Sequence, residues 1–87
     1  MKYSVLISPA ARRQIKKLSI SAQQQIVSKL KELETTVRPR GVEKLWAEKD
    51  LYRIRTGDYR IIYRISDTDL SVLILKVGDR SEIYRRI

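Results

Sequence analysis

The sequence predicts an α+β fold in which a strand and two helices are followed by three strands. Apolar side chains recur at helical spacing between residues 9 and 37, whereas residues 50–64 alternate apolar and polar side chains around a tight turn. Residues 70–77 are almost continuously apolar, as in a buried strand. A chain of 87 residues has room for one hydrophobic core, so we expect a single domain over residues 1–87.

The N-terminal segment predicts a short strand followed by an amphipathic helix. Residues 2–7 end in three apolar side chains, and Ser8-Pro9 fits an N-cap followed by proline at the first helical position. The apolar stripe of this helix consists of Ala11, Ile15 and Leu18.

A second helix is predicted to begin at the capping-box pattern of residues 21–24, with Ser21 as its N-cap. It is predicted to end at residues 38–41, because proline disfavours helical angles in the residue before it. Its apolar stripe consists of Ile26, Leu30, Leu33 and Val37. So short a break between the helices favours an antiparallel helical hairpin that covers one face of the sheet.

Residues 50–64 predict a β-hairpin with its turn at Gly57-Asp58. Successive side chains of a strand point to opposite faces, so each strand has one apolar and one largely basic face. The apolar face carries Tyr52, Ile54, Tyr59, Ile61 and Tyr63, and the opposite face carries Leu51, Arg53, Arg55, Arg60, Ile62 and Arg64. If the helices cover the apolar face, the arginines lie on the open one.

The segments around the hairpin carry weaker signals. We expect residues 42–49 to form an irregular connection held by Leu45 and Trp46. Trp46 is interpreted as a core anchor, with stacking on a base as the alternative. Residues 70–77 are expected to form a central strand covered on both faces, and residues 81–87 fit either a strand or a helical turn.

Composition narrows the kinds of chemistry and partner. Nineteen basic and ten acidic side chains give a net charge of +9, which favours a polyanionic or strongly acidic partner. Without cysteine or histidine, and with isolated glycines, we expect no metal site, no cofactor and no phosphate-binding loop. No apolar run reaches the ~20 residues of a membrane span, and the N-terminus does not resemble a signal peptide, so we expect a cytoplasmic protein without a membrane partner.

An arginine cluster on rigid strands suits phosphate chemistry. Guanidinium groups can hold phosphates and stabilise the extra negative charge of a phosphorane-like transition state without a metal. Tyr84, which is close in sequence to Arg80, can stack on a base or exchange a proton.

Residues 51–63, followed by Val77-Gly78, Arg80, Glu82 and Tyr84, resemble the RelE branch of the RelE/ParE toxin superfamily. The resemblance extends over the whole chain and implies a twisted, mainly antiparallel sheet of order β-α-α-β-β-β. It further implies the toxin of a type II toxin–antitoxin system, an mRNA interferase that cuts mRNA in the ribosomal A site and thereby inhibits translation.

The resemblance also assigns residues. It implies that Arg60, Arg80 and Tyr84 are catalytic, and it matches Arg53 and Arg55 to two basic positions of the family. We expect these two arginines, together with Arg64 and Arg85, to bind RNA. Arg53 and Arg55 match positions that are lysines in the best-known member, and an arginine does not readily act as a general base. We therefore expect that Tyr84 or Glu82 takes the proton, that ribosomal RNA assists, or that the enzyme is slow.

The family implies an acidic antitoxin as partner in a hetero-oligomer, besides mRNA on the ribosome. Two alternatives stay open from the sequence. The first is a ParE-like toxin that inhibits DNA gyrase, against which the combination of Arg60, Arg80 and Tyr84 argues. The second is an RNA-binding module without catalytic activity.

Overall fold

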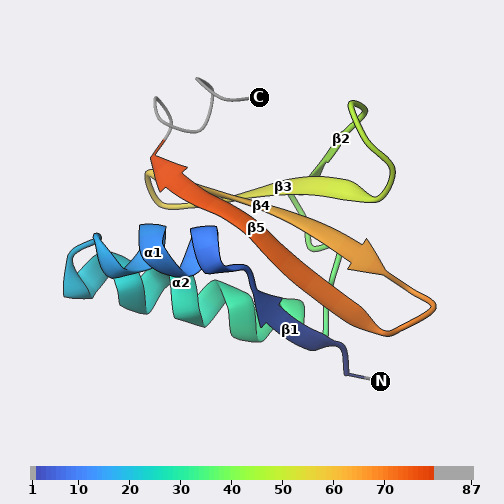
Figure 1. Cartoon of the computed structure of the whole chain (residues 1–87), viewed down its shortest axis with the longest axis horizontal. Helices are drawn as coiled ribbons and strands as arrows, with labels where there is room; N and C mark the ends of the chain where they lie inside the picture. The colour runs from blue at the N-terminus through green and yellow to red at the C-terminus, as the bar shows by residue number, and fades with distance from the viewer. Residues whose placement is uncertain (1, 80–87) are drawn as a thin grey trace.

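The computed structural model describes residues 2–79, and within them two helices cover one face of a five-stranded sheet (Figure 1). The elements in chain order are β1 (Ser4–Ile7), α1 (Pro9–Lys16), α2 (Ile20–Leu33), β2 (Glu43–Leu45), β3 (Leu51–Thr56), β4 (Tyr59–Ser66) and β5 (Ser71–Asp79). The α+β class and the helical layer on one face are confirmed. No helix within these residues is long and apolar enough to cross a membrane.

The strands lie in the order β1-β5-β4-β3-β2, with β1 parallel to β5 and every other pair antiparallel. The β3-β4-β5 meander was predicted, whereas β2 forms within a segment that we expected to be irregular. Glu43 pairs with Arg53, and Leu45 pairs with Leu51. A strand of three residues is too short to show an alternating pattern, which is why the sequence did not indicate it.

β5 is interior to the sheet, but the expectation that both of its faces are covered is wrong. Val72 and Ile74 are fully buried beneath the helices, whereas Leu73 and Leu75 on the other face are only half-buried. The physical reason is that both helices pack on the same side, so among residues 2–79 the opposite side of the sheet holds only a small apolar cluster. This cluster consists of Leu51 and Ile62, with Leu45 and Leu75 packed against them.

The helical hairpin has the predicted apolar stripes but different ends. Ser8 caps α1 by accepting a hydrogen bond from the Ala11 amide at 3.1 Å. Ser19 does the same for α2 through the Ala22 amide at 3.1 Å, so the predicted N-cap at Ser21 is wrong by two residues. α2 also ends at Leu33, before the predicted terminus.

The early end of α2 has a tertiary cause. Val37 is buried, but it lies in the loop that follows α2 and not in the helix. Its carbonyl accepts a hydrogen bond from the Tyr63 hydroxyl at 2.8 Å. Tyr63 is fully buried in the core between the helices and the sheet, and this burial raises the pKa of its hydroxyl. The other fully buried large side chains are Ile26, Leu33, Ile61, Ile65, Val72, Ile74 and Val77.

Arg38, whose role the sequence left open, fastens this loop to the β4–β5 turn. Its guanidinium forms an ion pair with Asp67 at 2.8 Å and donates to the Tyr52 hydroxyl at 3.2 Å. Tyr3 donates to the same carboxylate at 2.6 Å. The hydrogen bond from Arg38, followed by that from Tyr3, lowers the pKa of Asp67.

Candidate functional site

The β3–β4 hairpin places its arginines on the face of the sheet opposite the helices. The strands join through a two-residue turn in which Gly57 takes a φ of +60°, and Thr56 pairs with Tyr59. Arg55 then lies directly opposite Arg60, and Arg53 lies opposite Ile62. Residues directly opposite each other share a face, so the predicted basic face is present.

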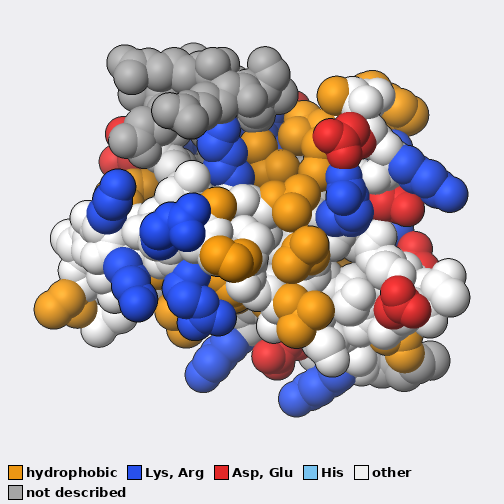
Figure 2. Space-filling model, in the orientation of Figure 1, with side chains coloured by type: hydrophobic (Ala, Val, Ile, Leu, Met, Phe, Trp, Pro, Cys, Tyr) orange, Lys and Arg blue, Asp and Glu red, His pale blue; other side chains and the backbone are white. Residues whose placement is uncertain are grey.

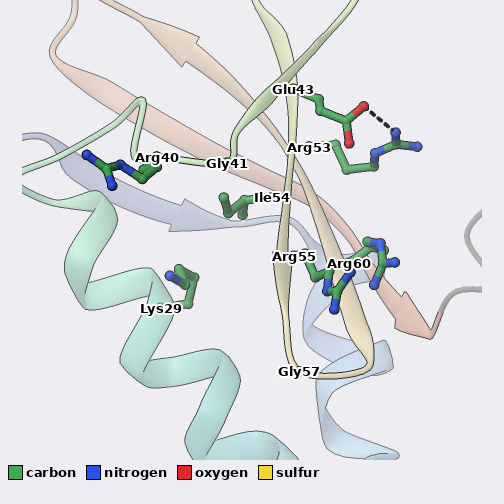
Figure 3. Close-up of a pocket in the computed structure, with 9 residues that line it drawn as sticks. All are labelled: Lys29, Arg40, Gly41, Glu43, Arg53, Ile54, Arg55, Gly57 and Arg60. Carbon is green, nitrogen blue, oxygen red and sulfur yellow. Dashed lines mark hydrogen bonds and ion pairs between the residues drawn. The ribbon is translucent and has the colours of Figure 1, made fainter.

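A cleft of about 410 Å³ lies at the edge of β3. β2 pairs with β3 only as far as Arg53, so within residues 2–79 the stretch from Ile54 to Thr56 has no strand partner on that side. The cleft occupies this space and is lined by Lys29, Arg40, Gly41, Glu43, Arg53, Ile54, Arg55, Gly57 and Arg60 (Figure 3). It therefore reaches around the edge of the sheet, from α2 to the basic face.

The lining is strongly cationic, because five basic side chains face a single carboxylate. Glu43 is engaged by Arg53 at 2.9 Å. Lys29 forms an ion pair with Glu32 at 2.9 Å on the helix surface. In Figure 3, Lys29 and Arg40 lie on one side of Ile54, and Arg55 and Arg60 lie together on the other. Positive charge thus lines both walls of the cleft.

Arg55 and Arg60 form a cross-strand pair of like charges, which is destabilising in a sheet. Within residues 2–79 neither has a carboxylate partner, and Arg60 donates only to the carbonyl of its neighbour Tyr59, at 3.4 Å. Such a pair costs stability in the free protein. A bound anion would relieve the repulsion and accept hydrogen bonds from both guanidinium groups.

The remaining predicted site residues fall elsewhere. Arg64 lies on the same face as the other hairpin arginines but is not among the residues lining the cleft, and it forms an ion pair with Glu48. Arg80, Tyr84 and Arg85 lie outside the described residues, so their roles stay predictions.

Three charged residues of the cleft were not predicted as site residues: Lys29, Arg40 and Glu43. Lys29 has the sequence signature of an ordinary solvated helix position, and Arg40 and Glu43 lie in a stretch without an interpretable pattern. Only the topology of the sheet, which brings this stretch beside the open edge of β3, identifies them as site residues.

Trp46 is not a core anchor, so that prediction is wrong. The residue is 83% exposed, because it follows the edge strand β2 and lies beyond the area that the helices cover. Its neighbour Leu45 points the other way and packs on Leu51 and Ile62.

This fold and cleft define a class: a small basic α+β protein with a cationic cleft at the edge of its sheet. The chain belongs to the family described as ParE toxin of type II toxin–antitoxin systems, parDE, whose family model matches residues 5–84.

Individual relatives are RelE proteins. The mRNA interferase toxin RelE of Escherichia coli strain K12 is 31% identical over 88 residues, which cover 97% of this chain and 92% of that protein. The toxin–antitoxin complex RelBE2 from Mycobacterium tuberculosis contains a chain with a TM-score of 0.82 and 30% identity, covering 92% of this chain and all of that one. The archaeal RelE–RelB complex from Pyrococcus horikoshii matches with a TM-score of 0.82 and 33% identity, over 92% of this chain and 97% of that one. The resemblance to the RelE family is confirmed.

Proposed function

We propose that this toxin is a ribosome-dependent, metal-independent endoribonuclease that cleaves mRNA in the A site and so inhibits translation. The observation that carries the proposal is the Arg55–Arg60 pair, which faces a cleft large enough for a nucleotide and lacks a carboxylate partner within residues 2–79. The similarity to the mRNA interferase toxin RelE of Escherichia coli supports the same activity.

In the proposed reaction the 2′-hydroxyl of one nucleotide attacks the adjacent phosphate. The O2′–P bond forms and the P–O5′ bond breaks, which leaves a 2′,3′-cyclic phosphate and a 5′-hydroxyl. The proton of the 2′-hydroxyl passes to a base, and the departing 5′-oxygen gains a proton. The phosphorane-like transition state carries extra negative charge, which preorganised guanidinium groups stabilise.

We assign Arg60 and Arg80 to the reacting phosphate, and Tyr84 to base stacking or proton transfer. Arg53 and Arg55 grip the RNA backbone, and Arg64 and Arg85 are assigned to further contacts with RNA. An arginine stays protonated at neutral pH and cannot take the proton from the 2′-hydroxyl. Besides Tyr84, Glu82 and ribosomal RNA, the cleft itself offers a carboxylate for this step, that of Glu43.

The proposal is tested by expressing the wild type and Arg60→Ala and mapping the 5′ ends of cellular mRNA. We expect wild-type induction to arrest growth and to produce new 5′-hydroxyl ends on translated messages. Removing one preorganised donor costs about 10²–10³ in rate, so Arg60→Ala should lose most cleavage. The matched control is Arg13→Ala, which removes the same charge from an exposed position on α1. Full cleavage by Arg60→Ala would contradict the assignment.

We further propose an acidic antitoxin as the partner in a hetero-oligomer. The solved relatives are toxin–antitoxin complexes, and the net charge of +9 suits an acidic partner. Action on ribosomes places the toxin in the cytoplasm.

A second candidate function is inhibition of DNA gyrase, because the matching family model is described as ParE toxin. Gyrase supercoiling assays separate the two candidates. Inhibition of purified gyrase without new mRNA ends would favour the second, and RNA binding with neither effect would indicate a module without catalytic activity.

A further inference from the structure

Trp46 is the only tryptophan of the chain, and it is 83% exposed. Lys44 holds its ammonium nitrogen 5.3 Å from the centre of the indole ring and 5.0 Å from that of Tyr52. This geometry is that of a cation–π contact, which orients the indole and places a positive charge beside it. A large aromatic surface is thus open to solvent, with a cation at its side.

The exposed indole lies close in the chain to one wall of the cationic cleft, although it does not itself line the cleft. Glu43, the first residue of β2, lines the cleft, and Trp46 lies three residues farther along the chain. Leu45, the residue before Trp46, pairs with Leu51 at the start of β3. From Leu51 to Arg55 the strand advances four residues, or about 13 Å at the rise of a strand. One extended ligand can therefore contact both places.

A second cation lies near Lys44, on the side of the sheet that faces the helices. Arg38 lies 5.2 Å from the centre of the Tyr52 ring that Lys44 also contacts. A base stacked on the indole would have its phosphate beside Lys44, and the rest of the strand would continue toward the arginines. Exposed aromatic rings next to a basic groove are the usual means of binding single-stranded nucleic acid.

We propose that Trp46 and Lys44 form a stacking site for one nucleobase of a single-stranded RNA whose backbone lies in the cleft. The proposal rests on the proposed function for the identity of the ligand as RNA. It adds a second contact, outside the cleft, in which the indole binds the base and Lys44 binds its phosphate. Because every base has an aromatic face, the site tolerates different sequences.

The experiment uses the intrinsic fluorescence of Trp46 in the full-length toxin, which reports on this one position. The ligand is a short single-stranded RNA with 2′-O-methyl groups that prevent cleavage, and its binding is also followed by the anisotropy of an attached dye. A second RNA of equal length carries abasic sites, which keep the phosphates and remove the bases. We expect the first RNA to quench the fluorescence and the second to bind without quenching.

Variants of Trp46, compared on the two RNAs, separate the contribution of base stacking from that of phosphate binding. Trp46→Ala should weaken binding of the base-bearing RNA about tenfold or more and leave the abasic RNA unaffected, while Trp46→Phe should retain most of the affinity. Ile20→Ala is the matched control, because it removes an apolar side chain that is 74% exposed on α2. Its affinities should equal those of the wild type.

Equal affinities of Trp46→Ala and wild type for the base-bearing RNA would overturn the proposal. So would quenching by an antitoxin peptide but not by RNA, which would make Trp46 a protein contact. Loss of mRNA cleavage in cells is a separate result: a toxin that binds and quenches but cuts no mRNA would refute the proposed function and leave the stacking site standing.

Discussion

Tyr63 shows how a single buried hydroxyl joins two parts of the chain. It lies on β4 with no exposed surface and donates a hydrogen bond to the carbonyl of Val37, in the loop after α2. Its ring also stacks on that of Tyr52, with centroids 6.0 Å apart. Because burial raises the pKa of this hydroxyl, Tyr63 remains a neutral donor at neutral pH and holds the loop in place.

Replacing Tyr63 with phenylalanine keeps the ring and removes the hydrogen bond. We expect Tyr63→Phe to lower the free energy of unfolding by about 1–2 kcal/mol, because the Val37 carbonyl loses its donor in a buried place. Urea unfolding measures the difference. Tyr59→Phe is the control, because Tyr59 is half-buried and no hydrogen bond of its hydroxyl is recorded within residues 2–79. Equal losses in the two variants would mean that the Tyr63–Val37 bond contributes nothing specific.

At the scale of the element, the β3–β4 hairpin depends on the conformation of Gly57. Its φ of +60° is unfavourable for any residue with a Cβ atom, and a Cβ atom there would lie 2.7 Å from Oε1 of Gln25 on α2. The turn fixes the register that sets Arg55 opposite Arg60. A change at Gly57 therefore acts on stability and on the cleft together.

We expect Gly57→Ala to cost about 1–2 kcal/mol of stability, the usual penalty for a left-handed conformation with a side chain. Thermal unfolding of Gly57→Ala, Gln25→Ala and the double variant separates the backbone strain at residue 57 from the steric clash with the Gln25 side chain. Since the Gln25 side chain can move aside, the double variant should remain nearly as destabilised as Gly57→Ala. Restoration of stability by Gln25→Ala would show that the collision, and not the backbone, is the cause.

The elements differ in how well the sequence predicted them, and the reasons are physical. The hairpin was predicted because alternation and a Gly-Asp turn are local signals. The N-cap was placed at Ser21 because residues 21–24 fit the capping-box spacing, whereas the structure shows that Ser19 accepts the hydrogen bond from the Ala22 amide. Trp46 was misplaced because hydrophobicity indicates a preference for burial, whereas exposure depends on where the edge of the sheet lies.

For the whole molecule, the net charge predicted an anionic ligand. Lys and Arg side chains are spread over the face of the molecule that Figure 2 shows, and only the fold shows which basic residues meet at the cleft. The arginines of β3 and β4 share a face because of strand alternation, which is visible in the sequence. Lys29 and Arg40 join them because β2 leaves the end of β3 open beside α2, and no local pattern encodes that arrangement. Of the charged residues that line the cleft, the three on the hairpin were thus predictable, and Lys29, Arg40 and Glu43 were not.

The salt dependence of RNA binding tests whether both walls of the cleft contact the same strand. Each phosphate contact with a single strand adds about 0.7 to the steepness of log K against log salt concentration. If Lys29 and Arg40 touch phosphates, Lys29→Ala and Arg40→Ala should each reduce the slope by about that amount, and the double variant by about 1.4. Differences between variants are the right measure, because cations outside the cleft add equally to every slope.

Lys31→Ala, an exposed position two residues farther along α2, is the control and should leave the slope unchanged. If Lys29→Ala, Arg40→Ala and the double variant all bind with the wild-type slope, the RNA contacts only the arginines of the hairpin. The wall formed by α2 and the following loop is then not part of the interface.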